Sequence, residues 1–326
     1  MHSDSVTISV VIPAYNSIGV LPTVLNALQQ QTLAFSLFEV IIVDDGSTDG
    51  TETIVHGLGL PDSFHYVRQQ NSGAATARNY GASLARGQYL LFLDSDVVPD
   101  PDLLSAHLEC HQAHERALVV GRTRVWTGYQ DAVFYRLMGK AIFAFDLGEQ
   151  EVPIGYQEVI SRNLSLARDA FQEIGGFDES FPHSGYEDTE FAYRAQQAGY
   201  QFVYGPRASG VHRHTGTLTQ VGEHMYNYQI SAALFISKHP EVKGQIRHLR
   251  DKEPIRLGHD SPGLLCRKFM RRIFTLDLCQ ALLRKAIARL EKQHPESPWL
   301  CTLYWQVLGD YLYRGYREGL RRYGHP

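Results

Sequence analysis

The chain has 326 residues, 44% hydrophobic and 20% charged, which suits one large domain or a domain with an extension. Its four cysteines form no C-x-x-C pair, so their spacing fits neither a disulfide framework nor a zinc site. Residues 240–326 carry 17 Lys and Arg against 9 Asp and Glu, which predicts an acidic body with a basic tail. We see no signal peptide and no apolar run of about 18 residues, so we expect a cytoplasmic chain without a transmembrane helix.

Strands and helices alternate through the N-terminal part of the chain. We expect buried strands at Val6–Ile12, Phe38–Val43, Phe64–Val67 and Tyr89–Leu93, and helices at Leu21–Leu28, after a capping segment Ser47–Asp49, and at Gly73–Arg86, with Arg86 on the exposed helix face. This alternation predicts an α/β fold with an open, mostly parallel sheet flanked by helices. In such sheets the ligand lies outside the carboxyl ends of the strands.

The pattern changes after about residue 115. We expect a strand at 117–126, a helix at 130–147, a short strand at Asn163–Leu166, a helix at Tyr186–Gly199, extended segments at Phe202–Tyr204 and Gly210–Val211, and only helices from 223 onward. The chain therefore divides into segments 1–115 and 116–235 and a helical C-terminal extension, 236–326.

Acidic pairs follow two of the expected strands. Asp94 and Asp96 at a strand end are placed to bind one Mg²⁺ or Mn²⁺ together, and Asp44 with Asp45 is placed to accept hydrogen bonds from a base or a ribose. The alternatives are a solvated acidic turn and a turn with a helix cap. The first lysine of the chain is Lys140, so a phosphate site in the N-terminal part would need a metal ion, arginine or backbone amides.

Three further positions add to this set. Arg78, among small residues near a helix start, could approach a phosphate, although an ordinary surface arginine is the alternative. Glu187 and Asp188 open a helix, where a carboxylate can serve as a general base or simply carry helix-terminal charge. His212 and His214 follow the last strand, and because alternate residues on a strand face opposite ways, we expect only one of them to ligate a metal.

These motifs together resemble glycosyltransferase family 2 over about residues 6–215. The resemblance is carried by Val10-Val11-Ile12-Pro13-Ala14-Tyr15-Asn16, Val43-Asp44-Asp45-Gly46-Ser47-Thr48-Asp49, Asn71-Ser72-Gly73 with Ala77-Arg78-Asn79, Leu93-Asp94-Ser95-Asp96, Gly175-Gly176-Phe177-Asp178-Glu179 and Glu187-Asp188. It implies a GT-A fold whose nucleotide-sugar-binding half is 1–115 and whose acceptor-binding half is 116–235. It also implies an inverting, metal-dependent transfer from a nucleoside-diphosphate-sugar, with a UDP-sugar as first choice, to a glycan or lipid-linked acceptor in cell-surface polysaccharide or glycolipid biosynthesis.

The resemblance also assigns roles to residues. The nucleotide would be bound by Pro13, Ala14, Tyr15, Asn16, Asp44, Asp45, Arg78, Asp94 and Ser95. Asp96 would be the principal ligand of Mn²⁺ or Mg²⁺, with Asp94 and His212 as further ligands and the choice between His212 and His214 open. Asp188 would be the base, and Glu187 would support it or meet one of the sugars. The processive-synthase signature Q-x-x-R-W is absent, which favours transfer of one or a few sugars.

The tail lies outside the resemblance. Cys266–Arg272 and Leu282–Arg289 mix basic and apolar residues at helical spacing, and an aromatic stripe runs from Tyr304 to Tyr316. One interpretation is a helix that docks on an anionic membrane surface, and the other is a packed helical cap. Alternative functions are an inactive nucleotide- or sugar-binding protein and a sugar nucleotidyltransferase, although the latter would want a Gly-rich phosphate loop where this chain has Pro13-Ala14-Tyr15-Asn16. Nucleic-acid binding by the tail has no supporting motif.

Overall fold

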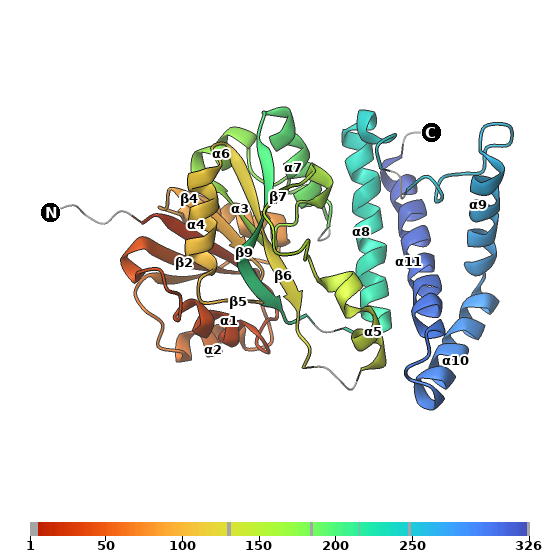
Figure 1. The fold of residues 1–326 in the computed structure, drawn as a ribbon, viewed down its shortest axis with the longest axis horizontal. Coiled ribbons are helices and arrows are strands. Elements are labelled where there is room, and N and C mark those ends of the chain that lie inside the picture. The colour runs from red at the N-terminus through yellow and green to blue at the C-terminus, as the bar shows by residue number, and fades with distance from the viewer. Residues whose placement is uncertain (1–5, 129–131, 183–184, 215, 247–248, 325–326) are drawn as a thin grey trace. The chain divides into compact units, whose positions relative to one another are not determined.

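The computed structural model describes residues 6–128, 132–182, 185–214, 216–246 and 249–324 (Figure 1). Contacts divide the chain into two compact units. The first consists of Met1–Trp126, Lys140–Pro182 and Glu187–His214, and the second of Thr127–Gly139, His183–Tyr186 and Thr215–Pro326. The expected boundaries at 115/116 and 235/236 stay predictions.

The first unit is built on one mixed sheet. Its strands are β1 (Ile8–Ala14), β2 (Phe38–Asp44), β3 (Phe64–Arg68), β4 (Tyr89–Leu93), β5 (Val97–Pro99), β6 (Ala117–Val125), β7 (Val152–Pro153), β8 (Asn163–Ala167) and β9 (Gln201–His212). They are ordered β3-β2-β1-β4-β8-β6-β9-β5, with β7 added beside β9. The strands β3, β2, β1 and β4 run parallel, and β8 is antiparallel to both of its neighbours. The expected α/β sheet is confirmed.

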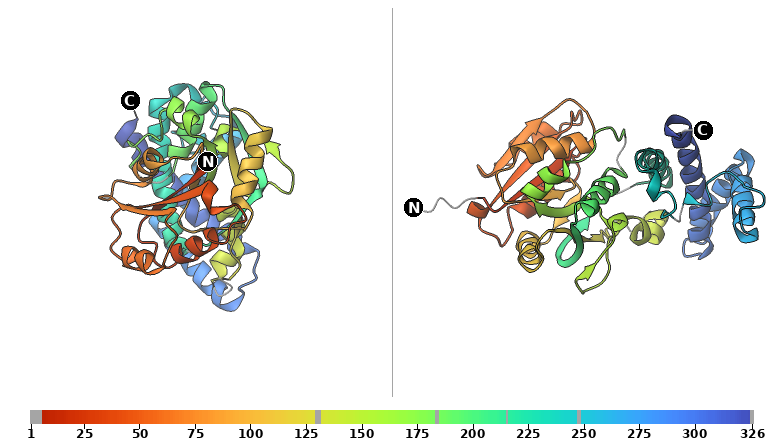
Figure 2. Two further views of the ribbon diagram at one scale, coloured as in Figure 1. Left: turned by 90° about the vertical axis from the view of Figure 1, so that its left-hand side faces the viewer. Right: turned by 90° about the horizontal axis from the view of Figure 1, so that it is seen from above.

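Helices cover both faces of this sheet (Figures 1 and 2). On one face, α1 (Leu21–Leu28) packs its apolar side on Val10 and Ile12 of β1. On the other face, α3 (Ala74–Leu84) approaches so closely that a Cβ on Gly81 would lie 2.4 Å from Cγ1 of Val11. Because successive side chains of a strand point to opposite faces, a stretch such as Val10–Ile12 of β1, which is apolar on both faces, is expected only where both faces are covered.

Two local expectations were only partly correct. The helix α2 (Thr51–Gly57) begins after Gly50, whose φ of 91° is left-handed. Of the expected capping segment Ser47–Asp49, Asp49 accepts from the amide of Thr51 at 3.0 Å, whereas the hydroxyl of Ser47 accepts from the amide of Asn16 instead. Arg86 lies beyond the end of α3 and not on its exposed face. Its amide and Nε donate to the buried carboxylate of Glu39, at 2.7 and 2.9 Å, and this contact fixes the turn into β4.

Other elements differ in extent or were not foreseen. The helix α5 (Val133–Phe143) is shorter than the expected 130–147, of which 130 and 131 lie outside the described residues. The two extended segments near 202 and 210 are one strand, β9. The helices α4 (Leu103–Ala113) and α6 (Arg168–Ile174) and the strands β5 and β7 were not predicted. The helix α7 (Glu187–Gln197) is shorter at both ends than the expected Tyr186–Gly199.

The second unit is helical. It contains α8 (Leu218–Lys238), α9 (Pro262–Phe274), α10 (Asp277–Gln293) and α11 (Trp299–Tyr323). The helices α8 and α11 pack with little space between their backbones, since a Cβ on Gly315 would lie 2.2 Å from the carbonyl oxygen of Tyr226. Tyr304 and Tyr316 of the aromatic stripe are fully buried. No described helix has both the length and the apolarity needed to cross a bilayer.

Two buried histidines link α4 to the sheet. Nε2 of His107 lies 2.8 Å from Oδ1 of Asn163, and the hydroxyl of Ser165 lies 2.8 Å from Nδ1 of His107 and 2.7 Å from Nε2 of His111. The ring of His111 also stacks on Tyr89. Burial lowers the pKa of His107 to about 4 and that of His111 to about 3, so both imidazoles are neutral in the folded chain at neutral pH.

We therefore expect the first unit to lose stability in mild acid. Between pH 6.5 and about 4, the histidines of the unfolded chain bind protons that the folded chain does not, so the free energy of unfolding falls as pH falls. The loss from pH 7 to pH 5 should be on the order of 2–4 kcal/mol. Urea unfolding followed at both pH values measures it, and an equal loss in the double variant His107→Gln/His111→Gln would contradict this assignment.

Candidate active site

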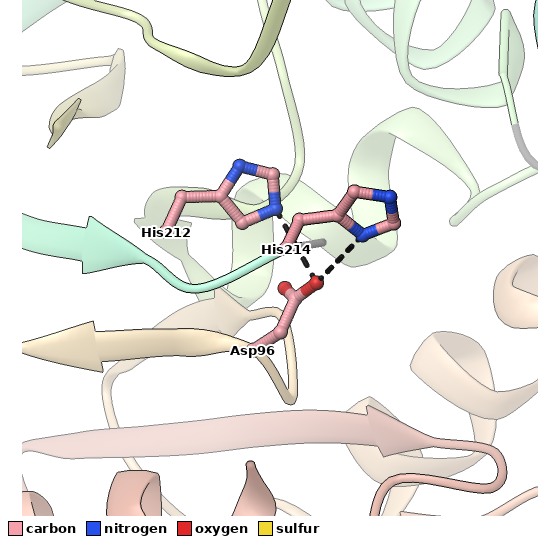
Figure 3. A group of neighbouring side chains, drawn as sticks. All are labelled: Asp96, His212 and His214. Atoms are coloured by element: carbon pink, nitrogen blue, oxygen red, sulfur yellow. Dashed lines mark hydrogen bonds and ion pairs between the residues drawn. The ribbon is translucent and has the colours of Figure 1, made fainter. Parts of the chain in front are cut away.

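A carboxylate and two imidazoles meet at the edge formed by β5 and β9 (Figure 3). Oδ2 of Asp96 lies 3.3 Å from Nε2 of His212 and 3.2 Å from Nδ1 of His214, and the possible ligand atoms all lie within 4.8 Å of one another. Strand pairing produces this meeting, because Val97 pairs with His212 and the amide of Arg213 donates to the carbonyl of Asp96 at 2.7 Å. The loop after β4 and the end of β9 are therefore held together.

Alternation along a strand, the reason for expecting only one histidine to ligate a metal, does not apply to His214. Strand β9 ends at His212, so the strict alternation of side chains does not extend to His214. Both imidazoles point to the same oxygen of Asp96 (Figure 3). Which of them binds a metal ion stays a prediction.

A second layer of contacts orients His212. Its Nδ1 lies 3.1 Å from the carbonyl oxygen of Phe143 and 3.0 Å from Nη1 of Arg162, so Nε2 is the nitrogen turned toward Asp96. A ligating histidine is commonly fixed in this way by a carbonyl that accepts from its other nitrogen. Neither Phe143 nor Arg162 could be identified from the sequence, because a backbone carbonyl leaves no side-chain pattern and a single arginine belongs to no motif.

The charge state of Asp96 reflects this environment. Burial alone would raise the pKa of its carboxyl group, but hydrogen bonds from His212 and His214 and the charge of those rings lower it overall. An ionised carboxylate beside two imidazoles is a donor set that accepts a divalent ion such as Mn²⁺. The residues present therefore fit the metal that the resemblance implies.

Asp94 lies outside this cluster. Its Oδ1 accepts a hydrogen bond of 2.9 Å from Nη2 of Arg78, and Nη1 of the same guanidinium lies 3.1 Å from Oε1 of Glu187. Arg78 is only 4% exposed, so the surface-arginine alternative is wrong. Burial opposes its charge, but Asp94 and Glu187 raise the pKa of Arg78 overall. That Asp94 shares the metal with Asp96 stays a prediction.

Asp188 lies in the first turn of α7, next to this ion-pair network. The turn is entered through Tyr186, a non-glycine residue with a φ of 70°. Oδ1 of Asp188 accepts from the amide of Thr189 at 2.8 Å. Burial raises the pKa of Asp188, opposed by the positive charge of Arg78. A carboxylate with a raised pKa is a stronger base than a free one.

The residues expected at the nucleotide lie at the ends of β1 and β2 and in the loop after β4. Ser95 reaches toward β1, with its hydroxyl 2.9 Å from that of Ser17. Asn16 has a φ of 49°, and its Oδ1 accepts from the amide of Thr48, at 2.8 Å. The side chain of Tyr15 is half exposed, whereas Pro13 and Ala14 belong to β1 itself.

The two aspartates after β2 make internal hydrogen bonds. Asp44 accepts from the amide of Ser47 and from the hydroxyl of Tyr66. Asp45 accepts from Gln69 and from the amides of residues 72 and 73, at 2.7 to 2.8 Å. These contacts hold the loops that flank the expected nucleotide position, and direct contact of either aspartate with a nucleotide stays a prediction.

Two family models match this chain. The model for glycosyl transferase family 2 matches residues 9–175, and the model for the N-terminal domain of galactosyltransferase matches residues 143–221. Among curated proteins, validoxylamine A glucosyltransferase of Streptomyces hygroscopicus subsp. jinggangensis is 30% identical, covering 72% of this chain and 61% of its own length. Pre-mycofactocin glycosyltransferase of Mycobacterium tuberculosis is 30% identical, covering 72% of this chain and 48% of its own length. The chain thus spans less than two thirds of both relatives.

Solved structures share the fold. The mannosyltransferase PcManGT from Pyrobaculum calidifontis, in complex with GDP-Man and Mn²⁺, aligns with a TM-score of 0.60 and 18% identity, covering 95% of this chain and 87% of the other. S. aureus TarS 1–349 in complex with UDP aligns with a TM-score of 0.53 and 18% identity, covering 97% and 91%. At this identity the likeness shows a common fold of the GT-A type.

Proposed function

The chain belongs to glycosyltransferase family 2, and from this premise we propose that it transfers a sugar from a nucleoside-diphosphate-sugar to a hydroxyl group of an acceptor, with inversion. The strongest support for this proposal is that one unit contains two groups of polar residues with complementary chemistry. One is the Asp96, His212 and His214 cluster, and the other is the Arg78–Glu187 ion pair beside Asp188. The first suits a cation that binds phosphates, and the second suits proton removal.

Asp96 and His212 would hold the divalent ion, with His214 adjacent. Mixed carboxylate and imidazole ligands favour Mn²⁺ over Mg²⁺, because imidazole suits transition metals. When bound, such an ion stabilises the negative charge that develops on a departing diphosphate. The chain has no lysine before Lys140. We therefore expect this cation, and not a lysine, to bind the diphosphate at the N-terminal half of the sheet.

Asp188 would accept the proton of the acceptor hydroxyl. The hydroxyl oxygen then forms the new bond to the anomeric carbon from the face opposite the leaving group. The old bond from the anomeric carbon to the diphosphate oxygen breaks, and its electron pair leaves with the nucleoside diphosphate. Arg78 would keep Asp188 and Glu187 in place and favour the ionised form of the base.

The donor would be a UDP-sugar first, and the acceptor a glycan or a lipid-linked sugar of cell-surface polysaccharide or glycolipid biosynthesis. On this proposal the chain works in the cytoplasm, at the inner face of the membrane where lipid-linked acceptors are exposed. The alternative is a nucleotide- or sugar-binding protein without activity. It would bind donors at the same site but release no nucleoside diphosphate.

A donor screen tests the proposal. We expect slow Mn²⁺-dependent release of nucleoside diphosphate from one class among UDP-, GDP- and dTDP-sugars, because water can replace the acceptor at the anomeric carbon. Chelation by EDTA should stop the release, and added Mn²⁺ should restore it. If a donor binds but no nucleoside diphosphate is released, even with a panel of glycan and lipid-linked acceptors, the result would support the alternative of an inactive binding protein. Absence of binding to any donor would refute both.

A further inference from the structure

The helices α9 and α10 turn apolar side chains away from the rest of their unit. On α9, Phe269 is 58% exposed and Met270 is 42% exposed, while Lys268 is buried. On α10, Leu278 is 73% and Leu282 is 58% exposed. An ordinary surface helix buries its apolar stripe, so these large exposed apolar side chains on two neighbouring helices are unusual. We call Phe269, Met270, Leu278 and Leu282 the apolar face.

Specific contacts hold α9 in this orientation. Nζ of Lys268 donates to the carbonyl of Pro254 at 2.9 Å and to Asp260 at 2.7 Å, so the charge on the inner side of α9 is paired. Arg271 donates to the carbonyl of Gly309 in α11, at 3.3 Å. One face of α9 is therefore fixed to the protein by its cations, and the opposite face carries Phe269 and Met270.

On α10, Arg284 donates to the hydroxyl of Tyr311 in α11, at 3.1 Å, and Ile287 is buried. Helical spacing places Leu278, Leu282, Lys285 and Arg289 on the opposite side of α10. Within the second unit, α11 lies between α8 and the pair α9–α10 (Figures 1 and 2). The apolar face therefore points away from α11 on both helices.

The charge around this face is of one sign. Arg267, Arg272, Lys285 and Arg289 are all exposed beside it. Between residues 262 and 289 the sequence has a single acidic residue, Asp277, and Arg314 of α11 pairs with it at 2.7 Å. Exposed Leu, Phe and Met bordered by Lys and Arg are the pattern of a surface that enters the interface of an anionic bilayer. A self-associating face would need acidic residues opposite these cations, and the α9–α10 surface offers none that is unpaired.

We propose that the apolar face and its basic border dock this chain on the surface of an anionic membrane. The four apolar side chains would enter the boundary between headgroups and acyl chains, and the four cations would lie at the level of the lipid phosphates. This extends the proposed location of the chain at a membrane and does not depend on the transfer reaction, since binding to lipid requires neither donor nor acceptor.

Vesicle flotation of the full chain without donor or metal tests this proposal. We expect strong binding to vesicles in which phosphatidylglycerol replaces about a third of the phosphatidylcholine, and several-fold weaker binding to phosphatidylcholine alone. The bound fraction should fall as salt rises from about 0.1 to 0.5 M. Leu278→Glu/Leu282→Glu should reduce partitioning about tenfold or more. Both leucines are largely exposed, so this variant should unfold at the same temperature as the wild type.

Two further variants sharpen the result. Leu84→Glu, which places the same change at an exposed leucine of α3, should bind vesicles like the wild type. Lys285→Glu/Arg289→Glu should abolish the preference for phosphatidylglycerol. Equal binding to both kinds of vesicle, or no loss in Leu278→Glu/Leu282→Glu, would overturn the proposal. A wild-type dimer that becomes monomeric in that variant, without vesicle binding, would assign the face to a second copy of the chain.

Discussion

Replacing Asp188 with asparagine should lower kcat by about 10²- to 10⁴-fold, the range that a general base contributes. The amide has almost the same shape and can still accept from the Thr189 amide, so α7 should begin where it does now. It cannot take a proton from an acceptor hydroxyl. Affinity for the nucleoside diphosphate, measured by calorimetry with Mn²⁺, should stay within a few-fold of wild type.

Asp169→Asn is the matched control for this variant. Asp169 is an exposed carboxylate in the first turn of α6, so its loss removes a helix-terminal charge without touching the site. Its activity should be that of the wild type. If Asp188→Asn lost nucleotide affinity as strongly as activity, Asp188 would be part of the donor site and the base would have to be sought elsewhere.

The N-terminal half of the sheet could be predicted because its strands are nearly continuous runs of Val, Ile and Leu. Within Phe38–Asp44, for example, the four consecutive residues Val40 to Val43 are apolar on both faces, which only a covered parallel sheet explains. Polar residues then mark each strand end, and the topology of parallel strands alone brings those ends to one edge. By contrast, α4 carries His107 and His111 on its buried side, so its sequence lacks the apolar stripe that would have identified it.

The detailed grouping of the site could not be predicted from spacing. Asp94 and Asp96 are two residues apart, yet the first pairs with Arg78 and the second with two histidines. That separation depends on where a buried guanidinium lies, which is a tertiary contact between α3, β4 and α7. The position of His214 likewise depends on β9 ending at His212, the residue paired with Val97 of β5. Neither feature produces a periodic pattern in the sequence.

The second large effect is expected from Asp96. Asp96→Asn removes the only carboxylate of the cluster among the described residues, so Mn²⁺ affinity should fall steeply and turnover by on the order of 100-fold or more. Thermal unfolding with and without Mn²⁺ measures how much binding of the ion stabilises the chain. Mn²⁺ at about 100 times its Kd should stabilise the wild-type chain by roughly 2.7 kcal/mol, and Asp96→Asn by much less.

The same measurement decides between the histidines. If His212 is the ligand, His212→Ala should lose most of the Mn²⁺ stabilisation and His214→Ala little, because the Phe143 carbonyl beside Nδ1 of His212 leaves its Nε2 turned toward the cluster. Asp102→Asn, just before α4 and outside the cluster, should respond to Mn²⁺ like the wild type. Stabilisation of Asp96→Asn equal to that of the wild type would mean that the ion binds elsewhere, and the assignment of this cluster to the diphosphate would then fail with it.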